Sequence, residues 1–246
     1  MSDRFLVNSG APVSVTSVSG AFGSWTSIWT PPVPLDCLFV MVGNVSGNPP
    51  QVGLYDVGVG SAPQSILPNG YDIFSNTNGS YLIYPMEFPA GKPIQIRANE
   101  TGGTSGALNI LMYGYPKGSS PYPVCNLSQI LAPTGGSNNF GPISATAPGT
   151  LYGTTLKLPA KMLSLFLAGQ GGTTSGQDVL DVGLYAGPSS SALEPVLPHV
   201  FASYYEVAQF SFHHAMRVEL PSFQEIYMLQ NSAANVTPYG CVRLFY

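Results

Sequence analysis

A tetrapeptide that returns half a chain later constrains the fold of this 246-residue chain more than any other feature. Val52-Gly53-Leu54-Tyr55 is repeated as Val182-Gly183-Leu184-Tyr185, at an offset of 130. Further matches keep their order, with offsets of 126 to 132, and are Leu38-Phe39 with Leu165-Phe166, Gly43 with Gly169, Ile66-Leu67-Pro68 with Val196-Leu197-Pro198, Phe88-Pro89 with Leu220-Pro221, Ile94-Gln95-Ile96 with Ile226-Tyr227-Met228, and Tyr115 with Tyr246. An ordered series of this kind predicts that the chain consists of one domain and its duplicate.

The distribution of glycine and proline predicts an all-β chain. The 28 glycines and 23 prolines recur at short intervals that would interrupt any helix. The apolar runs between them are short and bounded by turn residues, as in antiparallel sheets. We expect strands near residues 13–18, 36–42, 51–56, 80–83, 94–98 and 108–113 in the first half, and near 143–145, 163–168, 180–185, 204–212, 217–220, 224–229 and 241–246 in the second.

The fold class that follows is all-β, with two tandem antiparallel β-sandwich domains of the jelly-roll kind related by internal duplication. The first domain is expected over residues 1–116 and the second over residues 124–246. The segment between them, residues 117–123, is rich in proline and serine. We expect it to be a semi-rigid linker.

Low charge excludes several classes of partner. Charged residues make up 8% of the chain, against roughly 25% in an average soluble domain. The eight lysines and arginines are scattered, so the clustered cations that bind nucleic acid are missing. No apolar run reaches the ~18–20 residues of a membrane span, and no signal peptide is expected. A surface of low charge costs little to desolvate, which favours an assembly subunit made in a cytoplasm.

The histidines and cysteines form no pattern of a catalytic or metal site. His213 and His214 are adjacent, so in a strand they point to opposite faces, and His199 lies in a separate segment. No nucleophile elbow is present. Metal-binding spacing is also absent from the cysteines, which are Cys37, Cys125 and Cys241. We therefore expect no catalytic residue, no metal and no cofactor.

Paired carboxylates are the remaining chemistry to consider, because glycoside hydrolysis needs two acids about 5–9.5 Å apart. Glu206, Glu219 and Glu225 lie in expected strands, but none has a counterpart in the other half. Asp56 and Asp181 flank the repeated tetrapeptide on opposite sides, and Asp56 is interpreted as a turn-forming residue. The chain is therefore expected not to be an enzyme.

Aromatic residues, 11% of the chain, are the candidates for binding. Trp25 and Trp29 suit a sugar ring if they are exposed, and otherwise fill the cores. A second group occupies equivalent places in the two repeats, just after each Leu-Pro element, in segments expected to be loops at one end of each sandwich. The possible interface residues in these segments are Tyr71, Phe74, Phe201, Tyr204 and Tyr205.

Part of each half resembles β-sandwich modules of structural proteins in tailed-bacteriophage virions. In the first half the similarity rests on three elements, a D-x-G-x-G turn, an apolar-Pro-Asn element and a Pro-Ala-Gly turn that enters a strand. They are Asp56-Val57-Gly58-Val59-Gly60, Ile66-Leu67-Pro68-Asn69 and Phe88-Pro89-Ala90-Gly91. The second half keeps Gly183, Leu197-Pro198 and Leu220-Pro221, but lacks the Gly-x-Gly turn and the Ala-Gly pair.

The resemblance implies a non-enzymatic structural protein of the virion, such as a capsid decoration or cement protein or a head fibre. Its partners would be the major capsid protein or other virion proteins, and it would be a homo-oligomer, with a trimer favoured. No nucleic acid or membrane is implied, and the protein would join the virion in the host cytoplasm. The alternative is a tail-fibre or collar component, or a receptor-binding module that recognises carbohydrate.

Overall fold

The computed structural model of the chain describes residues 7–46, 52–66, 72–75, 80–100, 107–126, 128–131, 141–142, 149–155, 159–170, 177–205, 210–222, 224–230 and 237–246. The chain divides into two compact units, residues 1–128 and 129–246, which we call the first and second units and describe separately. The described residues contain strands and turns but no helix, and hence no helix that is long and apolar enough to cross a membrane. Both units are therefore all-β, and this part of the prediction is confirmed.

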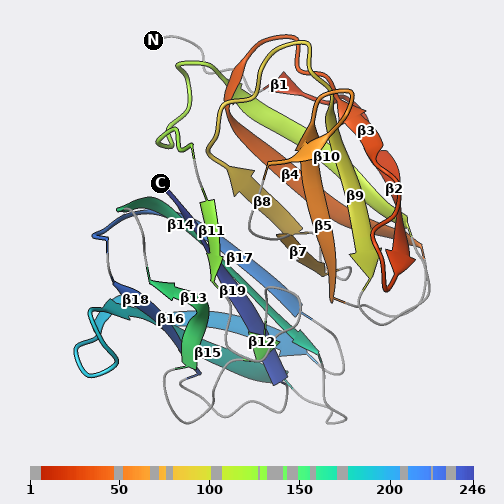
Figure 1. The fold of residues 1–246 in the computed structure, drawn as a ribbon. Coiled ribbons are helices and arrows are strands. Elements are labelled where there is room, and N and C mark those ends of the chain that lie inside the picture. Colours follow the sequence, from red (N-terminus) through yellow and green to blue (C-terminus); the bar gives the residue numbers. More distant parts are fainter. Residues whose placement is uncertain are drawn as a thin grey trace. The chain divides into compact units, whose positions relative to one another are not determined.

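Two sheets make up the first unit (Figure 1). One sheet has the order β2-β10-β4-β8, with β1 also beside β10, and we call it the first sheet. Its strands are β1 (Val7–Asn8), β2 (Val13–Ser19), β4 (Leu35–Ser46), β8 (Ser80–Tyr84) and β10 (Ala107–Pro116). The other sheet has the order β3-β9-β5, with β6 and β7 both on the far side of β5. Its strands are β3 (Thr26–Trp29), β5 (Val52–Val59), β6 (Gln64–Ser65), β7 (Asp72–Ser75) and β9 (Ile94–Glu100).

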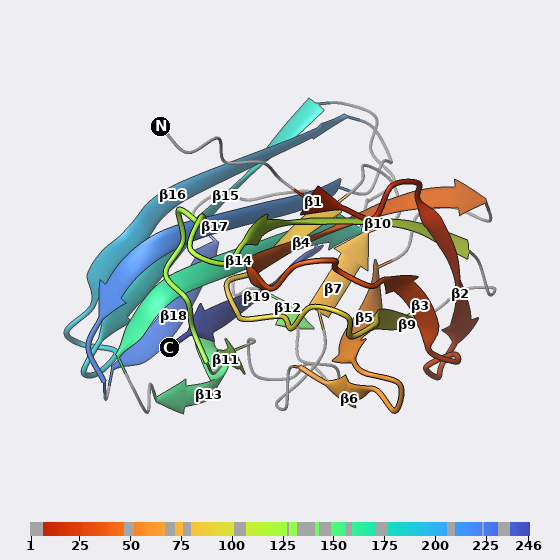
Figure 2. The same ribbon diagram turned by 90° about the horizontal axis from the view of Figure 1, so that it is seen from above.

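Strand β2 belongs to both sheets of the first unit. Its residues 13–16 pair antiparallel with β10, and residues 17–19 pair parallel with β9. The strand therefore passes from one layer of the sandwich to the other. In Figure 2 the layer of β4 and β10 can be followed separately from that of β3, β5 and β9. A strand shared in this way joins the two layers by backbone hydrogen bonds.

The second unit also has two sheets. One has the order β11-β19-β14-β17, with β12 beside β19, and is made of β11 (Ser128–Leu131), β12 (Gly141–Pro142), β14 (Ala160–Gln170), β17 (Phe210–Leu220) and β19 (Thr237–Phe245). The other has the order β13-β18-β15-β16 and is made of β13 (Gly149–Thr155), β15 (Gln177–Gly187), β16 (Glu194–Tyr205) and β18 (Glu225–Gln230).

The two units share one strand order. With β6 and β7 counted as one strand, and β1 and β12 left aside, each unit has strands 1-8-3-6 in one sheet and 2-7-4-5 in the other. This is the order of a jelly roll, an eight-stranded double sheet built from two Greek keys. The same order in both units is what duplication of one domain predicts, and the duplication itself stays a prediction.

The core of the first unit lies between the inner faces of its sheets, where alternate side chains of each strand meet. Across this core the hydroxyl of Tyr84 donates to the hydroxyl of Tyr55 at 3.1 Å, so two buried phenols satisfy each other. Each large apolar side chain buried here contributes about 1.5–3 kcal/mol. Core residues come from both sheets and include Leu38, Val40, Val42, Leu108, Ile110 and Met112 from one and Val57, Ile94, Ile96 and Ala98 from the other.

The core of the second unit follows the same rule. One sheet contributes Leu163, Leu165, Val218, Leu220, Val242 and Leu244, and the other contributes Val182, Leu184, Ala186, Val200, Ile226 and Met228. The repeated Val-Gly-Leu-Tyr lies in corresponding strands, β5 and β15, but its two copies turn different residues to the core. Val182 and Leu184 are fully buried in the second unit, whereas Tyr55 of the first copy is fully buried together with Val57, which follows the tetrapeptide.

Some strand ends in the second unit differ from the prediction. Residues 204–212, expected to form one strand, belong to two, because β16 ends at Tyr205 and β17 begins at Phe210. Residues 201–205, expected in a loop, continue β16 beyond its prolines. Among the described strands β16 pairs only with β15, and an edge strand tolerates proline because one side of its backbone needs no donor. The strand expected near 143–145 lies outside the described residues.

Residues 117–126, which follow β10, pack on the first unit, and we call them the strap. The backbone N–H of Gly118 donates to the carboxylate of Asp36 at 2.5 Å. The backbone N–H of Lys117 donates to the carbonyl oxygen of Pro34 at 2.9 Å. The residues expected to be a linker thus lie within the first compact unit, whose boundary falls after residue 128.

Gly114 tests the close packing of β10 on β4. A methyl group at this position would lie 2.4 Å from the carbonyl oxygen of Cys37 and 2.9 Å from Cδ1 of Leu35. We expect Gly114→Ala to lower the free energy of unfolding by about 1–3 kcal/mol, because one strand must move, and urea denaturation followed by circular dichroism measures the loss. Gly43→Ala is the control, since its methyl group would meet only the carbonyl oxygen of Asn109, at 4.0 Å. An equal loss in the control would contradict the steric explanation.

Candidate functional site

The outer face of the first sheet is apolar and aromatic, whereas the solvent-facing side of an antiparallel sheet is usually polar. Side chains of β4, β8 and β10 that do not face the core point to this side. They form, together with one ring from the strap, a surface that we call the tyrosine face. Its members are Phe39, Met41, Tyr81, Ile83, Leu111, Tyr113, Tyr115 and Tyr122.

The strand register arranges the tyrosine face in rows that run across three strands. The rows are Tyr81, Met41 and Leu111 in one and Ile83, Phe39 and Tyr113 in the other. The rings of Phe39 and Tyr113 stack with centroids 4.8 Å apart and planes 8° apart. Tyr122 of the strap meets Phe39 edge-on at 6.1 Å and Tyr115 at 6.5 Å. The strap is therefore part of this surface, and a face of each stacked ring is already occupied by its neighbour.

The tyrosine face carries no charge at neutral pH. Burial raises the pKa of the Tyr113 hydroxyl above its ordinary value, and the nearby hydroxyls of Tyr81 and Tyr115 raise it further. Burial also raises the pKa of Tyr122, with smaller contributions from Cys37 and the same tyrosines. The phenols of Tyr113 and Tyr122 therefore stay protonated at neutral pH.

Two members of the tyrosine face are unusually exposed. Tyr81 is 43% exposed and Met41 is 40% exposed, and among the described residues only Val33 joins them as an exposed large apolar side chain. Single exposed apolar side chains are common in proteins, but contiguous apolar patches mark contact sites. The rows of the sheet make these two side chains part of such a patch, because Met41 and Tyr81 are direct cross-strand partners.

Two free cysteines lie beside the tyrosine face. Cys37 of β4 and Cys125 of the strap are both buried, and neither forms a disulfide. Burial is the main cause that raises the pKa of Cys37 to about 12; a hydrogen bond with Ser120 lowers it, and Asp36 and Cys125 raise it. A thiol that stays protonated at neutral pH is neither a nucleophile nor a metal ligand. Cys37 and Cys125 are therefore buried packing residues, one in β4 and one in the strap.

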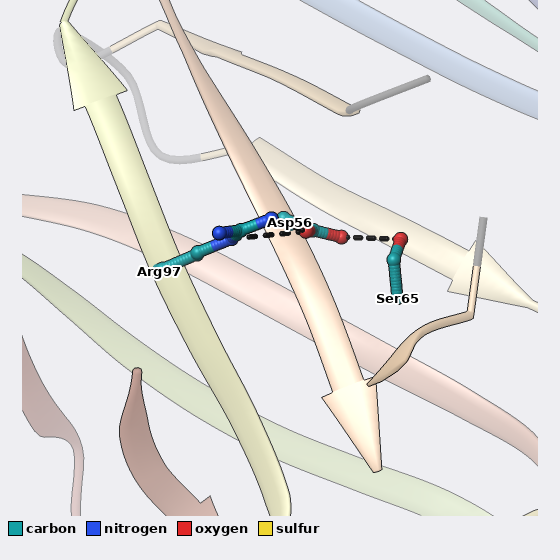
Figure 3. Close-up of polar contacts among 3 residues, drawn as sticks. All are labelled: Asp56, Ser65 and Arg97. Carbon is teal, nitrogen blue, oxygen red and sulfur yellow. Dashed lines mark hydrogen bonds and ion pairs between the residues drawn. The ribbon is translucent and has the colours of Figure 1, made fainter. Parts of the chain in front are cut away.

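A second cluster lies on the outer face of the other sheet of the first unit (Figure 3). Asp56 of β5 is opposite Arg97 of β9, and its Oδ2 accepts hydrogen bonds from Nη2 of Arg97 at 2.9 Å and from Nε at 3.1 Å. Its Oδ1 accepts from the hydroxyl of Ser65 in β6 at 2.6 Å. The Asp56 side chain is fully buried, and the side chain of Arg97 is 30% exposed. One carboxylate thus joins three strands.

Two aromatic rings cover this ion pair. The guanidinium carbon of Arg97 lies 4.6 Å from the centre of the Trp25 ring and 4.9 Å from that of Phe22. Gly58 leaves the room that Trp25 needs, since a methyl group there would lie 2.8 Å from Cη2 of that ring. Gly60 has φ of +100°, a conformation that suits glycine and that begins the turn after β5. In the D-x-G-x-G pattern, Asp56 is the acid of the ion pair, Gly58 lets the Trp25 ring pack closely on the strand, and Gly60 begins the turn.

The interpretation of Asp56 as a turn-forming residue is wrong. It lies within β5, four residues before the turn glycine, and its carboxylate is buried against Arg97. A buried carboxylate is stabilised by a paired cation and by hydrogen bonds, and both are present. Both carboxylate oxygens of Asp56 are taken up by hydrogen bonds from neighbouring strands, so the cluster holds β5, β6 and β9 together.

The residues predicted for binding do not share the same surroundings in the structure. Trp29 is 8% exposed and belongs to the core of the first unit, so it fills the core instead of forming a platform. Trp25 is partly exposed and gives one ring face to Arg97. Tyr71 lies outside the described residues. The backbones of the other interface candidates lie in strands, Phe74 in β7 and Phe201, Tyr204 and Tyr205 in β16.

Among the described histidines and acids considered for chemistry, one pair comes together, and it lies on the second unit. Nδ1 of His199 lies 3.0 Å from Oδ2 of Asp181, at an exposed position on the second unit. His213 and His214 lie in β17. In the part of the chain that the structure describes, no three side chains of histidine, cysteine, aspartate or glutamate form a group that could hold a metal ion. Of the acids considered above, Glu206 lies outside that part, Glu219 is exposed, and Glu225 accepts a hydrogen bond from Tyr227.

Comparison with known proteins adds no family. No protein-family model matches the chain, and no curated protein matches it. Among solved structures, the N-terminal CBM22-1-CBM22-2 tandem domain from Paenibacillus barcinonensis Xyn10C aligns at 9% identity and a TM-score of 0.31, over 99% of this chain and 95% of that one. The PBSX exported protein XepA aligns at 9% identity and a TM-score of 0.27, over 98% and 86%. N-glycanase F (PNGase F) aligns at 9% identity and a TM-score of 0.31, over 98% and 95%. Likeness this low carries no argument about function.

Asp56→Ala tests the buried ion pair. The change removes the carboxylate that satisfies Arg97 and Ser65, and we expect it to lower the free energy of unfolding by about 1–3 kcal/mol in chemical denaturation. Glu87→Gln is the matched control, because Glu87 pairs with Lys117 at 2.8 Å where both side chains are more than half exposed. An exposed pair contributes about 0–1 kcal/mol, so the two losses should differ clearly. Equal losses would show that Asp56 has no special role.

The thiol of Cys37 gives a test of the strap. At pH 8 we expect iodoacetamide to leave Cys37 and Cys125 unmodified in the folded protein and to alkylate both in urea, as mass spectrometry of peptides will show. The pKa of about 12 also predicts that stability falls as the pH rises above the ordinary value of 9.0. Above that pH the thiol ionises in the unfolded chain and stays protonated in the folded one. Rapid alkylation of folded Cys37 would contradict a docked strap.

Proposed function

We propose that this protein is a non-enzymatic structural subunit that binds a neighbouring protein subunit through the tyrosine face. The observation that carries the proposal is an uncharged, aromatic outer sheet face on which Tyr81 and Met41 remain exposed. Aromatic residues and methionine are enriched in the cores of protein interfaces, and charged residues are depleted there. Tyrosine suits such a site because its ring buries apolar area while its hydroxyl still finds a partner.

Binding of a sugar is the alternative that the geometry favours less. A sugar stacks on an open ring face. The rings of Phe39 and Tyr113 stack on each other, Trp29 is buried, and Trp25 covers Arg97 with one of its faces. A protein partner has no such requirement, because it packs against ring edges, hydroxyls and aliphatic groups together.

The resemblance to virion modules gives the proposed assembly its most specific form. We propose a tailed-phage virion as the location and a role as capsid decoration or cement protein, or as head fibre. The partners are then the major capsid protein or other virion proteins, with the chain as a homo-oligomer and a trimer favoured. The low charged fraction of 8% supports such a role, because little charge has to be desolvated when subunits meet.

Charge insertion tests the tyrosine face. We expect the wild-type protein to self-associate at micromolar concentration in sedimentation velocity experiments, and Met41→Glu or Tyr81→Glu to weaken this association by about tenfold or more, because a carboxylate would be desolvated at the contact. Both side chains are exposed in the folded unit, so the variants should fold. Ser61→Glu, at an exposed turn position, is the control and should associate like wild type. A monomeric wild type, or variants that associate normally, would contradict the proposal.

A further inference from the structure

A groove of about 400 Å³ opens on the second unit where β14 begins and β17 ends. The two strands meet there through the pair Ala160 and Leu220. Lys161 follows Ala160 and Glu219 precedes Leu220; both are exposed, and among the described residues neither side chain has an ion-pair partner. The lining consists of residues 159–161 and 218–222, all of them in the second unit.

The first unit has the same construction at the same point of its fold. Leu35, at the start of β4, forms a bridge with Phe88, just after β8, as Ala160 does with Leu220. Ala160 and Leu220 join the third and sixth strands of the second jelly roll, and Leu35 and Phe88 join the third strand of the first to the segment just after its sixth strand. The surrounding residues also correspond: Pro34 and Pro159 precede the first member of each pair, Pro89 and Pro221 follow the second, and Glu87 and Glu219 precede the second.

In the first unit this place is occupied by the strap. The backbone N–H of Lys117 donates to the carbonyl oxygen of Pro34 at 2.9 Å, and Nζ of Lys117 lies 2.8 Å from Oε1 of Glu87. The hydrogen bond and the charge of Glu87 are the main causes that raise the pKa of Lys117. The first unit thus shows how an extended, lysine-bearing segment binds at this construction.

One difference between the units defines the chemistry of a ligand. The residue after Leu35 is Asp36, which accepts the N–H of Gly118 from the strap. The residue after Ala160 is Lys161, a donor instead of an acceptor. A segment that binds the second unit in the same way therefore needs a cation next to Glu219 and an acceptor, best a carboxylate, next to Lys161.

We propose that the groove of the second unit binds an extended segment of a neighbouring polypeptide in the way that the strap binds the first unit. A lysine or arginine of that segment pairs with Glu219, its backbone N–H donates to the carbonyl oxygen of Pro159, and an acidic residue directly after it pairs with Lys161. Exposed ion pairs are weak singly, so the contact gains its strength from several copies in an assembly. The inference rests on the groove and not on the tyrosine face, so the two can fail separately.

A peptide derived from the strap tests the groove in the full-length protein. The probe is the sequence of residues 116–126 with Gly118→Asp, which supplies the carboxylate for Lys161, and Cys125→Ser, which prevents oxidation. Isothermal titration should show saturable binding in the micromolar to millimolar range. Glu219→Lys in the protein should weaken binding by about fivefold or more, and Lys117→Glu in the peptide should restore affinity for that variant.

A photo-reactive amino acid at the lysine position of the peptide locates the bound segment. Crosslinks to residues 218–222 support the groove, whereas crosslinks to residues 86–90 alone would mean that the peptide replaces the strap on the first unit and would overturn the proposal. Glu87→Gln is the matched control and should leave affinity unchanged. Absence of saturable binding, or unchanged affinity in a Glu219→Lys protein whose circular dichroism is that of wild type, would also overturn it.

Discussion

Packing of two sheets through their inner faces is the interaction on which the rest of each unit depends. The period of two along a strand sends every second side chain to this interface, and the remaining side chains must be accommodated on the outside. The first unit accommodates them in two ways. One outer face covers a buried ion pair with aromatic rings, and the other carries the tyrosine face with the strap beside it. Neither outer face is therefore an ordinary solvated sheet surface of polar side chains.

The ion pair of Asp56 and Arg97 illustrates how a buried polar group can specify a structure. Removal of a carboxylate from water is costly, and the cost is offset only when hydrogen bonds satisfy both of its oxygens. Here Arg97 and Ser65 do so from two strands on either side of β5. Slippage of β5 against β9 by one residue would leave the carboxylate unpaired, so the cluster fixes the register of the sheet in addition to its stability.

Much of the fold could be predicted from the sequence, because glycine, proline and short apolar runs report local structure directly. The all-β class and most strands of the first unit follow from these signals. The strap could not be predicted in this way, since its docking depends on Asp36 and Pro34, which are more than 80 residues away in the chain. Asp56 was misinterpreted because its partner Arg97 is 41 residues away in the chain. The tyrosine face could have been predicted, because residues 110–115 are apolar or aromatic at every position. A strand of this kind has no polar face to turn to solvent.

The strand β2 carries a consequence for the synthesis of the chain. Its partner β10 is made almost 100 residues after it, and its other partner β9 only shortly before β10. Until then β2 has no edge to pair with in either sheet, and the sandwich remains open. Closure of so long a loop is slow and exposes unpaired edges to other nascent chains. Within the first unit, the strand that joins the two layers is therefore among the last to be paired, and crowding of newly made copies is most hazardous just before that happens.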